Sequence, residues 1–549
     1  MPTVEHRTRT SIPVETWDLP REPGHSGPIA AVLADFLLSR RWYRDKTRSI
    51  QTLTVEDTLT IPGTDASLLL ATVVYVEGAA QNYLFAIAAA RGEEVLGIEA
   101  AHLEDIVARL EDDTGTQGIL YDAFANPKFT GSLLAAIRDE ISLAGQFGTL
   151  HAVKTPAFQR ILSEATVDLE PKVSRAEQSN TSVIFGESFI LKVFRKLEPG
   201  MNPDIEIGFF LTERSFAHSP SIAGSLEYRQ LGKQPLQLAI LQEFIRNEGD
   251  VWKYTINSLA SYFDQALKTP LRLPPEPVSF HPLTLMEGGL PREAPGIVGP
   301  YLEAAKVLGD RTARMHAALT DASAGSDFTP EPLTDDGKAE LYQSLVAQAK
   351  RGLALLRRMQ SRLGKQEYDD AQKVLDIEDR ILSRFEPLLN SPIHAVRIRH
   401  HGDFHLGQVL YTGADFKIID YEGEPARGLE ERRGKELAMR DVAGMIRSFQ
   451  YAPYAALFGQ VPGLTPTADT LPVLVAYADF WTACAGAKYL EGYFDAAAGL
   501  SSVPEDRVEQ KLLLDVFLLQ KALYEVGYEL NNRPDWVSIP LRGILMLLN

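Results

Sequence analysis

One short pattern constrains this chain of 549 residues more than any other. An aspartate lies in a glycine-flanked loop, an amide follows five residues later, and a second aspartate ends two short apolar runs. The loop is the segment His401–Gln408, and the second aspartate is Asp420. The apolar runs at 409–411 and 416–419 enclose a turn that contains Gly413, which is typical of a β-hairpin. Such a hairpin returns the second aspartate to the side of the loop.

The polar side chains of this pattern suit phosphoryl transfer. Asp403 is positioned to accept the proton of an acceptor hydroxyl, while Gln408 and Asp420 can hold the Mg²⁺ ions that bridge ATP phosphates. Glu422, two residues after Asp420, is a further candidate metal ligand. Asp441 opens a predicted helix, where it is expected either to cap that helix or to tie down the loop.

A β-rich stretch before the loop contains the features that an ATP site needs. Apolar runs at 181–185 and 189–194 predict a hairpin whose second strand carries Lys192. The Lys192 ammonium can pair with ATP phosphates, and Glu206, on a predicted helix, is expected to orient it. The other expected ATP-binding residues are Gln178, Ser179 and Asn180, which lead into the hairpin, and Gln242 and Phe244, whose backbone would face adenine. An ordinary polar turn is the alternative for residues 178–180.

A helical segment near the end of the sequence carries the expected acceptor contacts. Tyr524 and Tyr528 lie four residues apart, as do Glu525 and Glu529, so both pairs form stripes on the helix. Aromatic rings can pack on the apolar face of a sugar, and carboxylates can accept from its hydroxyls. His405, two residues after Asp403, is a further candidate contact with the acceptor. A partly buried amphipathic helix is the alternative interpretation.

Composition narrows the possible partners and location. The net charge is −18, from 55 basic and 73 acidic residues, which disfavours non-specific binding to nucleic acid or to anionic membranes. The sequence has no apolar run of 18 residues, and its first residues contain no apolar secretory region. Cys484 is the only cysteine, so no intramolecular disulfide can form. These features predict a cytoplasmic protein without nucleic-acid or membrane partners.

The order of predicted elements indicates an α+β chain of three parts. Residues 1–150 are expected to form a polar lead-in and a small cap domain, and residues 151–246 a β-rich lobe with the ATP-binding elements. Residues 247–549 are expected to form a mainly helical lobe with the catalytic loop and the acceptor site. A segment rich in Pro and Gly at 269–299 is predicted to be an exposed loop.

Together these segments resemble the bacterial maltokinases, which phosphorylate the reducing-end hydroxyl of maltose with ATP. The resemblance rests on Arg41-Trp42-Tyr43 with Lys46 and Arg48, and on the segments Glu177–Ser182, Leu191–Arg195, Leu241–Phe244, His401–Gln408, Asp420–Pro425, Arg440–Ser448 and Tyr524–Trp536. It implies a bilobal eukaryotic-protein-kinase-like fold with an N-terminal cap. It also implies ATP with Mg²⁺, maltose 1-phosphate as a product that feeds α-glucan or glycogen synthesis, and a functional association with trehalose synthase. Arg44-Asp45 departs from the small residues expected after the aromatic pair.

Two other functions stay open at this point. A glucosamine kinase, or another aminoglycoside-phosphotransferase-like kinase, would share the catalytic loop but bind a cationic acceptor. The terminal helix offers both aromatic and acidic residues, so its sequence does not separate the two acceptors. A relative without activity, acting as a scaffold for trehalose synthase, would not need Asp403, Gln408, Asp420, Lys192 and Glu206 together.

Overall fold

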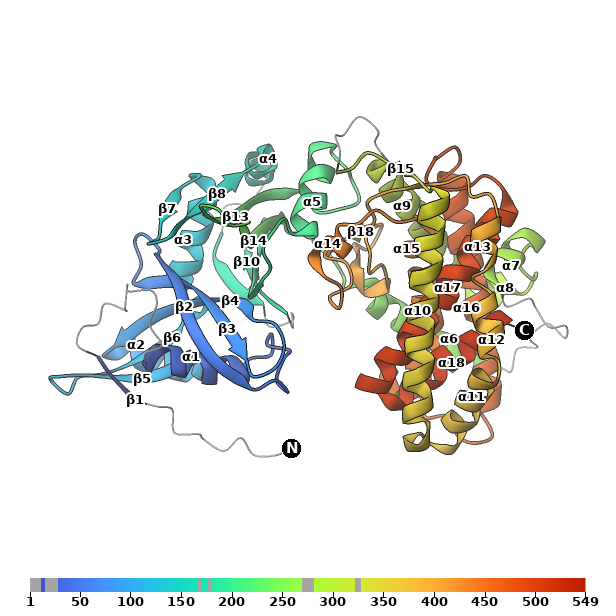
Figure 1. Ribbon diagram of the computed structural model, residues 1–549, viewed down its shortest axis with the longest axis horizontal. Helices are drawn as coiled ribbons and strands as arrows, with labels where there is room; N and C mark the ends of the chain where they lie inside the picture. The colour runs from blue at the N-terminus through green and yellow to red at the C-terminus, as the bar shows by residue number, and fades with distance from the viewer. Residues whose placement is uncertain are drawn as a thin grey trace. The chain divides into compact units, whose positions relative to one another are not determined.

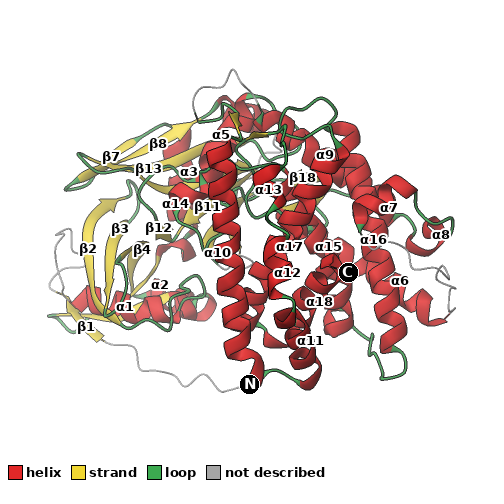
Figure 2. Ribbon diagram, turned by 45° about the vertical axis from the view of Figure 1, so that its right-hand side comes forward, coloured by secondary structure: helices red, strands yellow, loops and turns green. Residues whose placement is uncertain are grey.

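The computed structural model describes residues 11–14, 28–164, 169–174, 179–268, 281–320 and 327–548. Packing divides the chain into two compact units. Unit 1 comprises residues 1–215 and 220–246, and unit 2 comprises residues 216–219 and 247–549. Strands predominate in unit 1 and helices in unit 2 (Figure 2). This arrangement confirms the α+β chain with a largely helical second half that the sequence predicts.

The first sheet of unit 1 has seven strands in the order β1-β5-β6-β4-β3-β2, with β12 paired to β4 (Figure 1). Its strands are β1 Ser11–Val14, β2 Ile50–Thr60, β3 Ala66–Tyr75, β4 Gln81–Arg91, β5 Ile106–Asp112, β6 Gln117–Asp122 and β12 Lys196–Leu197. Its flanking helices are α1 Pro28–Ser39, α2 Glu93–Ala101, η1 Leu103–Asp105 and η2 Ala123–Ala125, whereas α3 Pro127–Arg138 packs on β8, β9 and β13 of the second sheet described below. Because β3 and β4 are covered on both faces, they are near-continuous apolar runs rather than alternating ones.

The second sheet of unit 1 has the order β7-β8-β13-β14-β11-β10-β9. Its elements, with two helices, are β7 Ser142–Ala144, β8 Gly148–Lys154, α4 Pro156–Glu164, β9 Pro171–Ser174, β10 Asn180–Phe185, β11 Phe189–Phe194, α5 Pro203–Glu213, β13 Ile222–Gln230 and β14 Leu236–Glu243. The hairpin predicted from the runs at 181–185 and 189–194 is confirmed, since β10 and β11 pair antiparallel with Ser182 opposite Lys192.

The two sheets of unit 1 share one apolar core. Leu59 and Leu84 of the first sheet belong to the same buried cluster as Val183 and Leu241 of the second. A buried carboxylate, Asp57 of β2, reinforces this junction. It accepts hydrogen bonds from the Tyr228 hydroxyl at 2.6 Å and from the backbone N–H groups of residues 146–148 at 2.8 to 3.1 Å. The boundary expected at 150/151 falls inside β8, and the three-part division stays a prediction.

Unit 2 is a helical bundle that holds two small two-stranded sheets. Its elements up to the catalytic hairpin are α6 Val251–Lys268, α7 Pro282–Gly288, α8 Ala294–Val298, α9 Tyr301–Leu319, β15 Glu331–Pro332, α10 Asp335–Met359, η3 Gln360–Arg362, α11 Lys365–Asp376, α12 Glu378–Ser383, α13 Pro387–Asn390, β16 Val396–Arg397, η4 Leu406–Gln408, β17 Val409–Tyr411 and β18 Phe416–Ile418. The remaining elements are α14 Leu429–Arg432, α15 Met439–Ala455, η5 Ala456–Gln460, α16 Leu471–Ala496, α17 Arg507–Asn532, η6 Pro534–Trp536 and α18 Ser538–Leu548.

The sequence predicts an exposed loop at 269–299, and the structure describes only the second part of this segment. Residues 269–280 lie outside the described residues, whereas 281–299 contain α7 and α8. Leu283 and Ala294 are fully buried there, so the prediction of an exposed loop is wrong for this half. Proline occupies the first turn of both helices, a position that needs no backbone N–H donor. The prolines that indicated a loop therefore start short helices.

Candidate active site

A buried carboxylate from α15 holds the catalytic loop. Asp441 accepts hydrogen bonds from the backbone N–H groups of His401 at 2.8 Å and Gly402 at 3.0 Å. Its other contact is His316 Nε2 at 3.2 Å, from α9. Burial opposes the charge of Asp441, but the hydrogen bond to His316 and the nearby His400 outweigh it and hold the pKa of Asp441 well below its usual range. Of the two roles expected for Asp441, the structure supports the tie to the loop.

Asp403 follows this anchored turn and faces a cation on α17. Lys521 Nζ lies 3.3 Å from Asp403 Oδ1 and 3.0 Å from Glu424 Oε1. Arg427 pairs with Glu424 from the other side, at 2.6 Å. A pocket of unit 2 opens onto these groups; it is lined by Gly402, Asp403, Phe404, Glu424, Arg440, Asp441, Gly444, Phe517, Gln520, Lys521 and Tyr524. The pocket thus combines a candidate base, two further carboxylates, cations and three aromatic rings.

Lys521 stays charged in this pocket. Burial disfavours the ammonium, but the carboxylates of Asp403 and Glu424 more than compensate and raise the pKa of Lys521. Glu424 is also charged. Burial opposes its charge, but the cations Lys521 and Arg427 outweigh burial and lower the pKa of Glu424. The sequence interpretation gave Lys521 no role, although it stands three residues before Tyr524 on the predicted helix. That spacing places both side chains on one face, and the Lys521 ammonium lies 4.9 Å from the Tyr524 ring centroid.

The predicted hairpin brings the candidate metal ligands together. The Gln408 amide donates to Asp420 Oδ2 at 2.8 Å. Asp420 has φ +67°, an uncommon conformation for a residue other than glycine and one that is concentrated at functional sites. Asp420 and Glu422 offer carboxylate oxygens within 4.8 Å of each other. An amide and two carboxylates form an oxygen-rich set, which fits the ligand preference of Mg²⁺.

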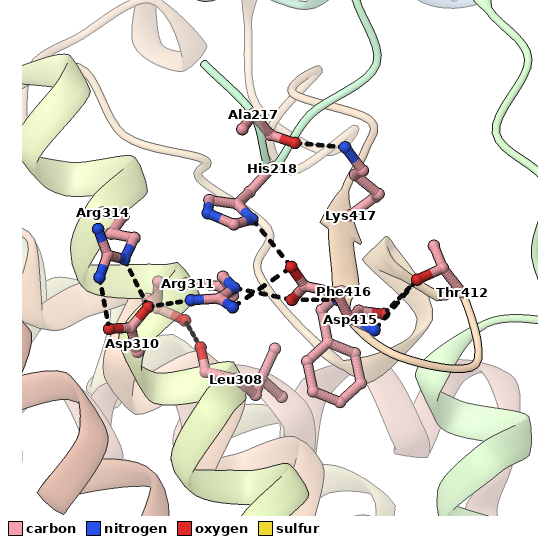
Figure 3. A network of polar contacts seen from close by, with 11 residues as sticks. Ala217, His218, Leu308, Asp310, Arg311, Arg314, Thr412, Asp415, Phe416 and Lys417 are labelled. Atoms are coloured by element: carbon pink, nitrogen blue, oxygen red, sulfur yellow. Dashed lines mark hydrogen bonds and ion pairs between the residues drawn. The ribbon is translucent and has the colours of Figure 1, made fainter.

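Figure 3 shows how the turn of this hairpin is anchored within unit 2. Asp415, between β17 and β18, accepts a hydrogen bond from Arg311 Nε of α9 at 2.7 Å, and His218 Nδ1 lies 3.6 Å from its other oxygen. The backbone of β18 also pairs with the segment 216–219, because Ile418 N donates to His218 O at 2.7 Å. The Ser219 hydroxyl donates to Ile418 O at 3.0 Å. These bonds fix the strand that leads into Asp420.

In unit 1, Lys192 lies on β11 as predicted and is nearly buried. Its ammonium pairs with Asp204 Oδ2 at 3.1 Å, and Asp204 is 1% exposed in the first turn of α5. The sequence interpretation assigned the orienting role to Glu206, two residues later on the same helix, and that assignment stays a prediction. Asp204 follows Pro203 at the start of the same helix, and the sequence interpretation gave it no role.

The remaining ATP-binding predictions are only partly addressed by the structure. Gln178 lies outside the described residues, while Ser179 and Asn180 precede and begin β10. Gln242 lies on β14, opposite Ile190 of β11. The Phe244 N–H donates to Ser188 O at 2.9 Å, so this donor is already used within unit 1. A role for residues 242 and 244 in binding adenine stays a prediction.

The residues predicted to bind the acceptor have different surroundings. Tyr524 lines the pocket, whereas Glu525 is buried and accepts from Arg447 Nε at 2.9 Å. Glu529 is 1% exposed and pairs with Arg533, and Tyr528 is 47% exposed. His405 Nε2 lies 3.9 Å from Asp403 Oδ2, and burial lowers the pKa of His405. Tyr524 therefore has the most direct access to an acceptor, and the other assignments stay predictions.

Two curated relatives are similar to the chain in sequence. A glucosamine kinase of Streptacidiphilus jiangxiensis is 25% identical over 382 residues, which are 68% of this chain and 72% of that protein. A glucosamine kinase of Mycolicibacterium smegmatis strain ATCC 700084 / mc(2)155 is 22% identical over 373 residues, which are 68% of this chain and 78% of that protein. No family model matches the sequence.

Solved structures share the fold over nearly the whole length. A glucosamine kinase in complex with glucosamine, ADP and inorganic phosphate matches with a TM-score of 0.60 at 19% identity, covering 96% of this chain and all of that one. A crystal form B of glucosamine kinase matches with a TM-score of 0.61 and the same coverage. The chain thus has a bilobal kinase-like α+β fold and resembles small-molecule kinases. Across the described residues we find no helix long and apolar enough to cross a bilayer.

Proposed function

We propose that this protein is an ATP-dependent sugar kinase that phosphorylates the anomeric hydroxyl of maltose, giving maltose 1-phosphate and ADP. The observation that carries the choice of a neutral acceptor is the charged Lys521, which lies between Asp403 and Glu424 in the pocket. A neutral hydroxyl can accept a hydrogen bond from this ammonium while it donates its proton to Asp403. The aromatic ring of Tyr524 adds a surface for the apolar face of a sugar.

The proposed reaction is a direct in-line transfer. The anomeric oxygen forms a bond to the γ-phosphorus as its proton moves to Asp403, and the bond from the γ-phosphorus to the bridging oxygen of ADP breaks. Asp441 positions the turn that presents Asp403, and Lys521 orients its carboxylate. Gln408, Asp420 and Glu422 are the residues that would hold Mg²⁺, and the bound ion offsets charge on the phosphates. In unit 1, Lys192 would pair with ATP phosphates and Asp204 would orient it.

Glucosamine is the second candidate acceptor, and the names of the sequence and structural relatives favour it. An amino sugar brings an ammonium group, which needs carboxylates without a competing cation. In this pocket Lys521 already pairs with both Asp403 and Glu424, and a second cation there would be repelled. The likeness to glucosamine kinases therefore supports the kinase reaction, and the pocket charges support the neutral acceptor.

The test is release of ADP from ATP with Mg²⁺ and, in parallel, maltose, glucose, glucosamine or kanamycin. We expect kcat/KM for maltose to exceed that for glucosamine by at least about tenfold, because Lys521 would repel the ammonium group of glucosamine. A tenfold ratio corresponds to a difference of about 1.4 kcal/mol in transition-state binding. Higher kcat/KM for glucosamine would refute the neutral acceptor but keep the kinase reaction. Absence of turnover with all four acceptors, in protein that still binds ATP, would refute maltose as the substrate.

The variant Lys521→Gln makes the test specific to the charge. Because it removes one cation and keeps a hydrogen-bond donor, it should shift the ratio of kcat/KM for maltose to glucosamine toward glucosamine by about fivefold or more. Lys521→Gln also removes the ionic contact with Asp403, which should lower kcat/KM for both acceptors. Comparing the ratio of the two kcat/KM values cancels this shared loss of activity. Arg440→Gln, at another cation of the same pocket, is the matched control and should change the ratio less.

The resemblance to maltokinases extends this proposal to the cell. In this proposal, maltose 1-phosphate is a precursor for α-glucan synthesis in the cytoplasm, and the kinase is functionally associated with trehalose synthase. Copurification of the two proteins, and loss of labelled glucan from labelled maltose in cells that lack this kinase, are the observations that would support these points.

A further inference from the structure

Two aromatic side chains of unit 2 flank one arginine, and a third ring packs on one of them. Tyr528 lies on α17, Trp536 on η6 and Phe458 on η5. The Arg533 guanidinium lies 4.3 Å from the Trp536 ring centroid and 5.7 Å from that of Tyr528. The Phe458 and Trp536 rings pack edge to face at 5.9 Å. We name Phe458, Tyr528, Arg533 and Trp536 the aromatic platform.

The aromatic platform is partly open to solvent. Phe458 is 43% and Tyr528 47% exposed, Arg533 is also exposed, and Trp536 is half-buried. Apolar rings of this size are more often covered, and an exposed group of them commonly marks a binding surface. Rings beside a cation are suited to sugars, because each ring can cover the apolar face of a pyranose while the cation donates to its hydroxyls.

Hydrogen bonds hold Arg533 and the turn that carries Trp536. Arg533 donates to both oxygens of the buried Glu529, at 3.0 and 2.7 Å, so its guanidinium has one orientation. The backbone N–H of Trp536 donates to Arg533 O at 2.8 Å, which closes the turn of η6. Phe458 lies at a kink within η5, where its backbone and that of Gly459, at φ +103°, leave the helical conformation. A rigid surface loses little entropy when it binds a ligand.

The aromatic platform continues the acceptor pocket along one helix. Lys521 and Tyr524 line the pocket, and Tyr528 lies one turn beyond Tyr524 on the same face. Seven residues of α-helix separate Lys521 from Tyr528, a rise of about 10 Å. This length is close to that of two linked pyranose rings. A third ring of a linear saccharide would therefore reach Trp536 and Phe458.

We infer that the aromatic platform is an extension of the acceptor site that binds the third and later glucose residues of linear α-glucans. This inference rests on the proposed function, since it takes the pocket at Asp403 as the place of the reducing-end sugar. It makes malto-oligosaccharides, and not maltose alone, ligands of this protein. Rings beyond the second one would stack on Trp536 and Phe458, and Arg533 would donate to their hydroxyls.

Equilibrium binding without ATP tests the inference. We would measure dissociation constants for maltose, maltotriose and maltotetraose by titration calorimetry with the full chain. The tetrasaccharide should bind about fivefold to tenfold more tightly than maltose. Trp536→Ala and Phe458→Ala should each remove most of this gain, while Trp536→Tyr should restore part of it. Phe147→Ala, an exposed aromatic of unit 1, is the matched control and should keep the gain.

Several outcomes would overturn the inference. Equal affinity for maltose and maltotetraose in the unaltered protein would do so, as would an equal loss for both sugars in Trp536→Ala. If Trp536→Ala lowers the denaturation midpoint but keeps the gain with chain length, the rings serve packing only and the inference fails. Binding is measured without ATP, so it can be separated from catalysis. If maltotetraose binds more tightly than maltose, and this difference depends on Trp536, the platform is supported even when the protein does not turn over maltose. The proposed function would then be refuted.

Discussion

The substitution Asp441→Asn tests whether the catalytic loop is held by a buried charge. Asp441 is 2% exposed and accepts three hydrogen bonds, from the backbone N–H groups of His401 and Gly402 and from His316. Asparagine has nearly the same volume, so the change leaves no cavity. It removes the charge, and its NH₂ group must face one of the three donors.

The size of the effect follows from these contacts. Hydrogen bonds to a charged acceptor contribute about 1.5 to 3 kcal/mol each, and breaking a buried ionic contact costs about 3 to 5 kcal/mol. We therefore expect Asp441→Asn to lower the free energy of unfolding by about 3 kcal/mol. The turn that presents Asp403 should also shift, and a displacement of about 1 Å can lower kcat by about 100-fold.

The pH dependence gives an independent check. The pKa of Asp441 lies well below its usual range in the folded protein, while that of an unfolded aspartate is about 3.9. The stability that Asp441 contributes is therefore fully present above about pH 5 and is lost as the pH falls toward the folded-state pKa. The difference in unfolding free energy between the unaltered protein and Asp441→Asn should be smaller at pH 3.5 than at pH 7.

Urea denaturation and maltose-dependent ADP release are the two assays. Asp479→Asn is the matched control, because Asp479 is also a buried carboxylate of unit 2, accepting from Tyr454 at 2.7 Å and pairing with Arg542. Both variants should lose stability, but only Asp441→Asn should lose about 100-fold in kcat. Equal effects on kcat at equal loss of stability would show that Asp441 acts on folding alone, and a positioning role would be refuted.

Two further predictions concern the base and a buried pair in unit 1. Asp403→Ala should lower kcat by at least about a thousandfold while calorimetry shows nearly unchanged ATP affinity; residual activity within tenfold would contradict its assignment as the base. Arg195, 2% exposed, pairs with Asp122 at 2.7 Å, so Arg195→Met or Asp122→Asn alone should each destabilise the protein by about 3 to 5 kcal/mol. The double variant should cost clearly less than the sum of the two single ones in urea denaturation, and simple additivity would show that the pair is not coupled.

The sequence allowed the kinase-like fold and the hairpins that carry the candidate site residues to be predicted, because both depend on local pattern. Glycine and alternating apolar residues specify the hairpin that joins Gln408 to Asp420, and the same logic located Lys192 on its strand. The contact of Lys192 with Asp204 was not accessible in this way. Both are acidic residues of the first turn of α5, and only the packing of β11 against that turn selects a partner.

Long-range contacts account for what was missed in the acceptor pocket. Lys521 and Asp403 are 118 residues apart, and a lysine on an amphipathic helix is ordinarily a solvated one. Glu525 looked equivalent to Glu529 by spacing, yet their partners, Arg447 and Arg533, come from different elements. The sequence specified the stripe, whereas the fold determined which of its members face the pocket.

The segment 216–219 determines where this protein can be cut to express one unit as a separate fragment. It belongs to unit 2, although the residues on either side of it belong to unit 1. A fragment that begins at residue 247 would lack the backbone partner of Ile418 and leave its N–H and carbonyl groups without the bonds from residues 218 and 219. Cutting at 246/247 therefore exposes one edge of the catalytic hairpin, so the helical half is not a self-sufficient gene fragment. A circular permutant that starts within the first sheet would preserve this pairing, and it is the more promising route to rearranged or fused versions of the enzyme.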